Sequence, residues 1–373
     1  MTSWIRHSLI QNSKTSAKRE NTIFVFCVYL FTKSMSNRES LLSLNDKITA
    51  AVTLLKAGKN VAFPTETVYG LGADITNVSA INQIFEIKGR PVDHPLIVHF
   101  AEVHLLDYWA IDIPDSAWLL AEHFWPGPLT LILPRSSHVP LNVTGGQNTV
   151  GLRIPDHPIA LALLKALGEN KALAAPSANR FGRISPTSAN HVYEEFGSEV
   201  SMILDGGPCR VGLESTIISF YHSEAVLLRP GGIPVESLEE ILKQKIKLKE
   251  NLNTSLRAPG GLSSHYAPMT SLEVWPTEYI QQRAQQLNKS GLRTALIAWS
   301  GSDYFSQIIN ENTHLFLMPA DPIEYGHQLY ATLRELDQDN FFCILVETPP
   351  TDPAWLAISD RLQRASYKTS IHL

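Results

Sequence analysis

From Ile48 onward, segments with apolar residues at helical spacing alternate with short apolar runs that are typical of buried strands. This alternation predicts an α/β fold. In the first part of the chain, strands are expected at residues 60–63, 96–100, 129–134, 149–154, 172–176, 202–204, 215–221 and 225–229. Helices are expected there at residues 44–57, 79–87, 115–124, 157–167, 189–196 and 235–244.

A second alternation begins at Thr270, after a connector at residues 257–268 that is rich in Gly, Pro and Ser. Strands separated by helices are typical of a parallel sheet, so this part predicts a small Rossmann-like domain. Its strands are expected at residues 272–275, 294–299, 315–319 and 342–347, and its helices at residues 279–289 and 322–336.

Residues 1–34 differ from the rest of the chain. Basic residues precede an apolar run at residues 23–31, which is about half the length that spans a bilayer. A targeting segment is one interpretation, although no small-residue cleavage site follows the run. We favour a disordered extension or a start codon assigned too early, because Met35 opens a segment that reads as a natural beginning.

The composition is that of an ordinary, slightly acidic protein of 373 residues, with a formal net charge of -5 and 44% hydrophobic residues. This balance excludes a globally basic nucleic-acid binder but allows a local basic cleft. The three cysteines, Cys27, Cys209 and Cys343, are scattered and form no CxxC pair. We interpret them as reduced thiols of a cytoplasmic protein, without a zinc site or disulfide framework.

Two cations stand together where one predicted helix ends. Lys88 and Arg90 flank Gly89, and Pro91 follows. Gly89 and Pro91 end the helix, so we expect both cations on a constrained turn. Arg can bind two oxygens at once and Lys is a compact point charge, so the pair suits a polyphosphate. An ordinary surface loop is the alternative.

Polar side chains follow two further strands, at the edge where open α/β sheets bind ligands. Thr65, Glu66 and Thr67 follow the strand at residues 60–63, and Ser177 and Asn179 follow the strand at residues 172–176. Hydroxyl and amide groups can bind phosphate or ribose, and they can equally cap a turn or a helix. Both interpretations remain open at this stage.

Two arginines lie in or at the end of apolar strands. Arg153 is inside the strand at residues 149–154, and a buried Arg must be paired. Its partner is either an internal carboxylate or the carboxylate of a ligand. Arg229 ends the strand at residues 225–229, where it is either an anion ligand or a surface residue beside a turn.

Several other chemistries are disfavoured by missing motifs. The sequence has no Gly-x-Gly-x-x-Gly after a strand, no P-loop, no Gly-x-Ser-x-Gly and no His-Glu-x-x-His. His94, His99, His104 and His123 lie within thirty residues but lack a metal-ligand spacing. We therefore expect no metal held by protein ligands.

Ten short blocks in consistent order resemble the YrdC-like family, in its two-domain branch of L-threonylcarbamoyladenylate synthases. The first five blocks are Pro64-Thr-Glu-Thr-Val-Tyr-Gly-Leu-Gly, Lys88-Gly-Arg-Pro, Pro95-Leu-Ile-Val-His, Trp125-Pro-Gly-Pro-Leu-Thr and Val150-Gly-Leu-Arg-Ile-Pro. The other five are Ala175-Pro-Ser-Ala-Asn, Ser185-Pro-Thr, Leu213-Glu-Ser-Thr-Ile, Leu228-Arg-Pro-Gly and His265-Tyr-Ala-Pro.

The resemblance implies a YrdC-like twisted open α/β sheet domain followed by a smaller Rossmann-like parallel α/β domain. The catalytic domain would cover residues 41–230, a linker or lid residues 231–269, and the C-terminal domain residues 270–373. Residues 1–40 would lie outside these domains as the extension described above.

The resemblance also implies a nucleotidyltransferase reaction in which L-threonine, bicarbonate and ATP give threonylcarbamoyl-AMP and pyrophosphate. Mg²⁺ is expected to arrive with ATP and to be held mainly by its phosphates and water. The product would pass to a tRNA threonylcarbamoyl transferase complex that modifies adenosine in the anticodon loop. Contact with tRNA itself would then be indirect, and no membrane is involved.

Site residues carry over from the same blocks. The expected threonine ligands are Thr67, His99, Arg153, Ala175 and Ser215. The expected ATP ligands are Lys88, Arg90, His94, Thr149, Ser177, Asn179, Ser185, Arg229 and Tyr266. Lys88 and Arg90 would also be catalytic by steadying the triphosphate. His94 departs from the family pattern, which has Asn at this position in many members.

Two alternatives remain beside this function. One is a relative that uses carbamoyl phosphate, but the accessory acylphosphatase-like and zinc-finger segments expected for it are missing. The other is an RNA-binding module that uses the cationic cleft. The acidic overall charge and the hydroxyl-rich cleft favour ATP over RNA.

Overall fold

The computed structural model describes residues 43–220, 224–248, 256–260, 265–301, 303–306 and 308–367. The predicted extension at residues 1–40 lies outside the described residues. The chain divides into two compact units after Ala50.

The first element among the described residues is the helix α2 (Leu44–Lys56). Its start is fixed by a reciprocal exchange of hydrogen bonds between Ser43 and Asp46. The Asp46 amide donates to Ser43 Oγ at 3.2 Å, and the Ser43 amide donates to Asp46 Oδ2 at 3.2 Å. This pair acts as a capping box, because two otherwise unpaired amides of the first turn are satisfied.

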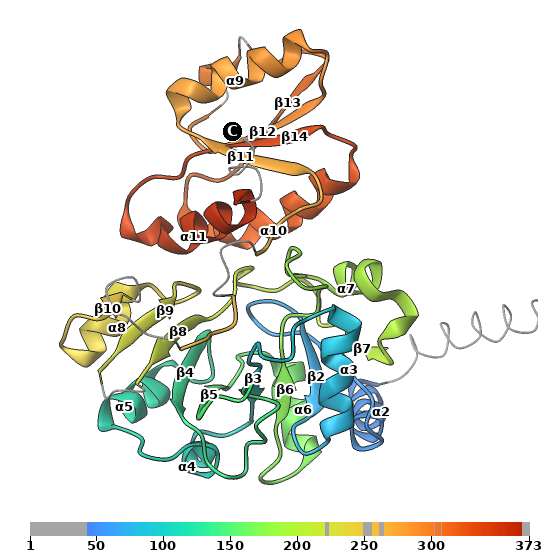
Figure 1. The fold of residues 1–373 in the computed structure, drawn as a ribbon, viewed down its shortest axis with the longest axis vertical. Helices are drawn as coiled ribbons and strands as arrows, with labels where there is room; N and C mark the ends of the chain where they lie inside the picture. The colour runs from blue at the N-terminus through green and yellow to red at the C-terminus, as the bar shows by residue number, and fades with distance from the viewer. Residues whose placement is uncertain are drawn as a thin grey trace, which may run out of the picture. The chain divides into compact units, whose positions relative to one another are not determined.

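A mixed ten-stranded sheet forms the first domain (Figure 1), in the order β10-β9-β8-β4-β5-β3-β6-β2-β1-β7. Parallel and antiparallel pairs alternate irregularly within it: β4 pairs antiparallel with β5 and parallel with β8. The strands are β1 (Val61–Phe63), β2 (Gly70–Asp74), β3 (Ile97–His99), β4 (Leu129–Pro134), β5 (Thr149–Arg153), β6 (Leu173–Ala175), β7 (Met202–Ile203), β8 (Thr216–Ser219), β9 (Val226–Arg229) and β10 (Lys247–Leu248).

Short helices accompany this sheet. They are α3 (Val78–Lys88), α4 (Leu106–Trp109), α5 (Asp115–Phe124), α6 (Pro158–Leu167), α7 (Ala189–Phe196) and α8 (Val235–Leu242). All except the four-residue helix α4, which was not predicted, agree closely with the predicted ones. Helix α8 packs against α5, and β10 pairs with β9. These two elements, which fall within the predicted linker at residues 231–269, therefore contribute to the first sheet domain.

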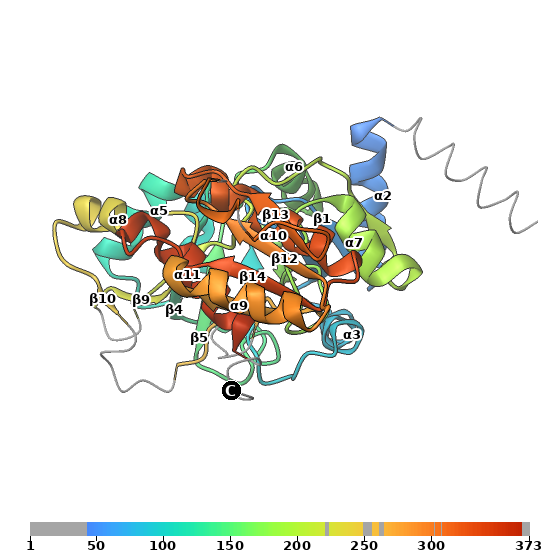
Figure 2. The ribbon, with the colours of Figure 1, turned by 90° about the horizontal axis from the view of Figure 1, so that it is seen from above.

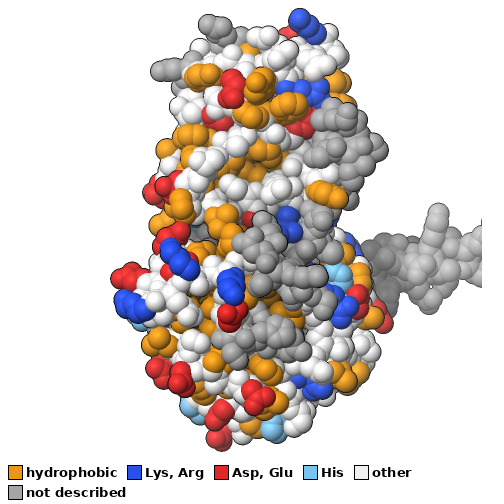
Figure 3. Space-filling view, turned by 60° about the vertical axis from the view of Figure 1, so that its left-hand side comes forward, with side chains coloured by type: hydrophobic (Ala, Val, Ile, Leu, Met, Phe, Trp, Pro, Cys, Tyr) orange, Lys and Arg blue, Asp and Glu red, His pale blue; other side chains and the backbone are white. Residues whose placement is uncertain are grey.

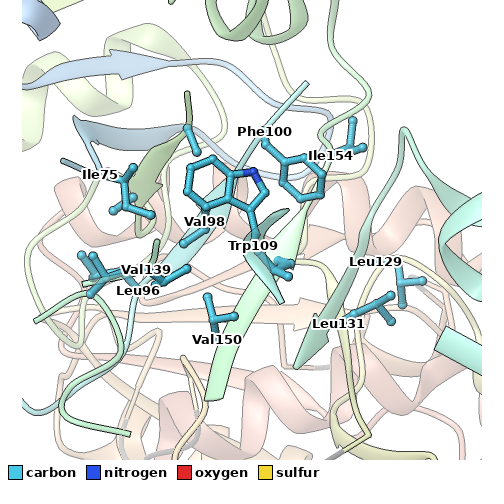
Figure 4. Packing of buried hydrophobic residues seen from close by; sticks show 14 of the residues in the cluster. Ile75, Leu96, Val98, Phe100, Trp109, Leu129, Leu131, Val139, Val150 and Ile154 are labelled. Carbon is cyan, nitrogen blue, oxygen red and sulfur yellow. The ribbon is translucent and has the colours of Figure 1, made fainter. Parts of the chain in front are cut away.

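The core of this domain is built from strand residues and aromatic side chains. Trp109 is 1% exposed and lies beside Phe100 and Val98 (Figure 4). Leu129, Leu131 and Leu133 alternate along β4 and belong to the same buried cluster. Burying these apolar side chains removes them from water and is the main term that stabilises the sheet.

Strand β2 is an element that the hydrophobic pattern did not predict. Its sequence, Gly-Leu-Gly-Ala-Asp, lacks the β-branched residues that favour strands. Here Gly70 and Gly72 lie against the ring of Phe63, since an added Cβ would stand 3.1 and 3.0 Å from its atoms. The glycines thus allow β1 and β2 to pair while the aromatic ring occupies the space above them.

A separate four-stranded sheet forms the C-terminal domain, in the order β11-β14-β12-β13, and all its pairs are parallel. Its strands are β11 (Ser271–Trp275), β12 (Thr294–Ala298), β13 (Thr313–Leu317) and β14 (Cys343–Glu347). Its helices are α9 (Thr277–Lys289), α10 (Pro322–Gln338) and α11 (Leu356–Ser366). The predicted Rossmann-like parallel sheet is confirmed, whereas α11 was not predicted.

Both faces of the second sheet are covered by helices, with α9 on one face and α10 and α11 on the other (Figure 1). Along β12, Ala295 and Ile297 belong to the cluster that contains α10 and α11 residues, and Leu296 and Ala298 to the cluster of α9. Figure 2 shows β12, β13 and β14 from above. No helix among the described residues is long and apolar enough to cross a membrane.

A core substitution tests the packing of the first sheet. Leu131→Ala removes a fully buried side chain from β4 and should lower the free energy of unfolding by about 2–5 kcal/mol. Leu119→Ala, on the exposed side of α5, is the control and should cost about 0.5 kcal/mol or less. Urea denaturation measures both, and equal losses would contradict this description of the core.

Candidate active site

A cavity in the first domain collects residues from the ends of several strands and from the connector. Its walls come from β2, β3, β5, β6, the segment before β8, the end of β9, and Pro259, Gly260, His265 and Tyr266 of the connector. Eight of the predicted site residues line it: Arg90, His99, Arg153, Ala175, Ser177, Ser215, Arg229 and Tyr266. The other six stand outside this lining: Thr67, Lys88, His94, Thr149, Asn179 and Ser185.

The end of α3 positions the two cations. Gly89 adopts a left-handed conformation (φ 60°) that ends the helix, and the Arg90 amide then donates to the Phe85 carbonyl at 2.9 Å. Lys88 is therefore the last helical residue, and Arg90 is the first residue beyond the cap. The predicted end of the helix at Gly89 is confirmed, although only Arg90 lies on the turn itself.

Both cations are buried and held by main-chain carbonyls. Lys88 Nζ donates to the Ser177 carbonyl at 2.6 Å and also to the Asn179 carbonyl. Arg90 Nη2 donates to the Pro95 carbonyl at 2.8 Å. Burial, reinforced by Arg90, lowers the pKa of Lys88 well below its ordinary value, and burial lowers the pKa of Arg90 to about 10.

This wall of the cavity attracts anions. Among the described residues, neither Lys88 nor Arg90 forms an ion pair with a carboxylate. Carbonyl dipoles satisfy their hydrogen-bond donors but do not cancel their charge. The wall therefore favours a ligand that brings negative charge, such as a phosphate.

Arg153 has the internal partner that was one of its two predicted alternatives. Its Nη2 lies 2.7 Å from Glu66 Oε1, and both side chains are buried. The same nitrogen donates to Thr67 Oγ1 at 2.8 Å. Glu66 Oε2 accepts from the Asp156 amide at 3.0 Å, so the carboxylate is held from two sides. Arg153 thus lines the cavity as a paired and oriented cation.

Arg229 holds the segment before β8 against the connector. Its Nη2 donates to the Ser215 carbonyl at 2.9 Å and to Ser215 Oγ at 3.1 Å, and its Nη1 donates to the Pro259 carbonyl at 3.1 Å. Ser215 Oγ also lies 2.7 Å from Thr130 Oγ1. Arg229 is 4% exposed, which excludes the alternative of a surface arginine.

Glu214 is a member of the cavity wall that was not among the predicted site residues, although it lies in the block Leu213-Glu-Ser-Thr-Ile. It accepts from Ser185 Oγ at 2.6 Å, from the Tyr330 hydroxyl at 3.0 and 3.2 Å, and from Arg361 Nε at 2.7 Å. Burial raises its pKa, but Arg361, Arg229 and the hydrogen bonds outweigh burial and lower the pKa to about 2. Glu214 is therefore ionised.

The connector closes the cavity with two buried aromatic residues. Tyr266 has a left-handed backbone (φ 61°), which is uncommon outside glycine, and its ring stacks on Tyr330 with centroids 5.9 Å apart. Three buried polar atoms near the cavity have no hydrogen-bond partner in the described part of the chain. These atoms are Tyr266 OH, His265 Nδ1 and Asn179 Oδ1. A polar ligand would satisfy groups of this kind.

Five predicted ATP ligands stand outside the cavity lining, and Thr149 and His94 are two of them. Thr149 begins β5 opposite Pro134 and is buried. His94 is half-buried and packs edge-on against Phe181, with ring centroids 5.2 Å apart. Burial and then Arg90 lower the pKa of His94. Among the described residues, no group of three His, Cys, Asp or Glu side chains could hold a metal ion.

Taken together, the fold and the cavity define an α/β protein with a cationic, hydroxyl-lined site at strand ends. Two family models cover nearly the whole described chain. The model Sua5_yciO_yrdC, described as "Telomere recombination", matches residues 53–231. The model described as "Threonylcarbamoyl-AMP synthase, C-terminal domain" matches residues 233–366.

Curated relatives and a solved structure agree with these models. The chain is 40% identical to the threonylcarbamoyl-AMP synthase of Pyrococcus abyssi, over 86% of this chain and 94% of the relative. It is 39% identical to that of Bacillus subtilis, over 87% and 94%. The crystal structure of P. abyssi Sua5 complexed with L-threonine matches with a TM-score of 0.78 and 39% identity, over 86% and 94%. The chain belongs to the two-domain threonylcarbamoyl-AMP synthase family.

Removing one partner of the buried ion pair should be costly. Arg153→Met leaves Glu66 as an uncompensated buried carboxylate and should lower the free energy of unfolding by about 3–5 kcal/mol. The matched control is Arg210→Met, which breaks an exposed pair with Asp156 and should cost about 1 kcal/mol or less. Denaturant titration compares them, and a small loss in Arg153→Met would show that the pair is not buried in solution.

Two buried imidazoles should make stability depend on pH. Burial lowers the pKa of His99 and of His265 from 6.5 to about 3. Between these values the unfolded chain binds protons that the folded protein does not, so stability falls as the pH falls. From pH 7 to pH 5 each imidazole should lower the free energy of unfolding by about 2 kcal/mol.

The variant His265→Gln isolates one of these contributions. Its free energy of unfolding should fall less than that of the wild type between pH 7 and pH 5, when both are measured by urea titration. His123→Gln, which changes an exposed residue of α5, should leave the wild-type dependence intact. Identical pH dependence in His265→Gln and the wild type would contradict a buried, neutral His265.

Proposed function

We propose that this protein forms threonylcarbamoyl-AMP and pyrophosphate from L-threonine, bicarbonate and ATP. The family membership supports this reaction, and the observation that carries it in the structure is the pair Lys88 and Arg90. Both cations are buried beside the cavity and held by carbonyls rather than by carboxylates, so a triphosphate would supply the counter-charge that they lack. Arg153 and Arg229 line the same cavity.

The reaction needs no covalent intermediate on the protein. The threonine amine and bicarbonate combine to a carbamate with loss of water, and a carbamate oxygen then attacks the α-phosphorus of ATP while pyrophosphate leaves. Lys88 and Arg90 would stabilise the charge that moves onto the departing pyrophosphate. The buried position of both cations strengthens this effect, because little water screens them.

We propose that threonine binds near Thr67, His99, Arg153, Ala175 and Ser215. In this arrangement the Arg153 guanidinium meets the substrate carboxylate, and Glu66 fixes its orientation. His99 is neutral at physiological pH, since burial lowers its pKa to about 3. It would therefore act as a hydrogen-bonding group rather than as a second cation.

The nucleotide would lie between the Lys88–Arg90 wall and the connector. Asn179 Oδ1, His265 Nδ1 and Tyr266 OH offer it unpartnered polar atoms. Ser177 lines the cavity and remains a proposed ligand. Ser185, Thr149 and His94 also remain proposed ligands, although these three stand outside the cavity lining. Mg²⁺ would neutralise the phosphates and be held by them and by water, because the described cavity residues offer it no cluster of carboxylates.

The RNA-binding alternative fits the structure poorly. Lys88 is 3% exposed and Arg90 is 7% exposed, so a nucleic-acid backbone cannot reach them without opening the domain. On the face viewed in Figure 3, acidic and basic side chains are interspersed. A protein that neutralises many phosphates needs an accessible row of cations. We propose that the product, rather than this protein, serves tRNA, through a threonylcarbamoyl transferase in the cytoplasm.

Pyrophosphate release tests the reaction. With ATP and Mg²⁺, pyrophosphate should appear only when both threonine and bicarbonate are present. Lys88→Ala and Arg90→Ala should each lower kcat/KM by about 100-fold or more, because each removes a donor to the transition state. Lys165→Ala, an exposed change on α6, is the control and should retain wild-type activity.

Three results would refute the proposal. Folded wild-type protein that releases no pyrophosphate with all substrates present would exclude the reaction. Release that is independent of threonine would indicate a different acceptor. Wild-type rates in Lys88→Ala and Arg90→Ala would exclude the role given to these cations.

A further inference from the structure

Arg361 belongs to α11 of the C-terminal domain, yet its side chain contacts the first domain. Its Nε donates to Glu214 Oε2 at 2.7 Å, and its Nη2 donates to the Pro230 carbonyl at 3.0 Å. Its guanidinium lies over the ring of Tyr266, 4.9 Å from the centroid. The side chain is 1% exposed, so these contacts are closed to solvent.

Apart from an ion pair between its Nη1 and Asp360 Oδ2 (2.6 Å), these contacts of Arg361 are made to the wall of the cavity. Glu214 and Tyr266 line it directly, and Pro230 follows the lining residue Arg229. Three segments that are far apart in sequence therefore meet at one side chain from the other domain. These segments are the residues just before β8, the residue just after β9 and the connector.

Tyr330 of α10 contacts the same two cavity residues, Glu214 and Tyr266. Its hydroxyl donates to both oxygens of Glu214, at 3.0 and 3.2 Å, and its ring stacks on Tyr266. Glu214 in turn accepts from Ser185 Oγ at 2.6 Å. The C-terminal domain thus fixes the Glu214 carboxylate, and this carboxylate in turn accepts a hydrogen bond from the Ser185 hydroxyl of the proposed nucleotide site.

Charge explains why this carboxylate needs a partner. A buried carboxylate without a counter-ion is unfavourable, and beside a phosphate site it would repel the ligand. Arg361 supplies the compensating charge from outside the cavity lining. Arg90 and Arg229, which line the cavity, then keep their own charge for an anionic ligand.

We propose that Arg361 is a positioning residue for nucleotide binding, which acts through Glu214 and gives the C-terminal domain a part in ATP affinity. It orients Ser185 and Tyr266 and cancels the charge of Glu214 without touching the nucleotide. This inference rests on the proposed function, because it assumes that the cavity binds ATP. It predicts that loss of Arg361 weakens ATP binding more than threonine binding.

The test measures direct binding of ATP with Mg²⁺ by calorimetry, and the KM values for ATP and for threonine. Arg361→Met should raise the Kd and KM for ATP at least about tenfold, and should raise the KM for threonine much less. The matched control is Arg283→Met, which removes the Arg283–Glu273 ion pair (2.7 Å) inside the C-terminal domain. Its Kd for ATP should stay within about twofold of the wild type.

A double-mutant cycle tests whether the effect passes through Glu214. Glu214→Gln alone should also weaken ATP binding, and the double variant Glu214→Gln/Arg361→Met should bind ATP no worse than the weaker single variant. Independent, additive losses would overturn the route through Glu214. A lower melting temperature with an unchanged Kd for ATP would reduce Arg361 to a structural role and overturn the inference.

Tyr330→Phe keeps the test decisive if Arg361→Met does not fold. This change removes only the hydroxyl that donates to Glu214, and it should raise the Kd for ATP several-fold. An unchanged Kd in folded Tyr330→Phe would then overturn the inference. Wild-type protein that binds no ATP would refute the proposed function as well, whereas wild-type affinity in Arg361→Met would refute the inference alone.

Discussion

Charge buried out of water is the constraint on which the site depends. Lys88, Arg90, Arg153 and Arg229 all lie in or behind the wall of one cavity and are nearly inaccessible to solvent. Each must be satisfied, and the fold does so in two ways. Carbonyl oxygens hold Lys88 and Arg90, whereas a carboxylate pairs with Arg153.

These two solutions have different consequences for a ligand. A cation that is held by carbonyls keeps its net charge and attracts phosphate. A cation that is paired with a carboxylate has a fixed orientation, but the pair as a whole is nearly neutral. Such a cation selects its ligand by the geometry of the hydrogen bonds rather than by electrostatic attraction. The cavity therefore has one wall suited to a polyphosphate and another suited to a small zwitterion, which agrees with the two substrates proposed for it.

Much of the fold was predictable, because most helices are amphipathic and most strands are apolar. The bounds of β4, α5 and α7 agree with the prediction to the residue. Strand β2 was not predictable from propensity, since its glycines are explained only by the ring of Phe63 that lies against them. Helix α11 buries Ile358, Arg361, Leu362 and Ala365 at helical spacing. It was not predicted, because a charged residue, Arg361, stands in this otherwise apolar stripe.

The site residues could be predicted only where they stand close together in short sequence blocks. The blocks at Lys88–Arg90, Ser177–Asn179 and Arg229 point to the cavity without a structure. The pairing of Arg153 with Glu66 was left open, because 87 residues separate the two and no local pattern joins them. The role of Arg361 could not be predicted from the sequence, because it depends on a contact with Glu214 in the other domain.

The distance in sequence between Glu214 and Arg361 also matters during synthesis. The two residues are 147 positions apart, and Arg361 lies in the last described helix. A nascent chain that has completed the ten-stranded sheet already contains Lys88, Arg90, Arg153 and Arg229, but its Glu214 still lacks the counter-ion. A prematurely terminated chain that lacks Arg361 would have the same defect. The charge balance of a site near the middle of the chain therefore depends on a residue close to its carboxyl-terminal end.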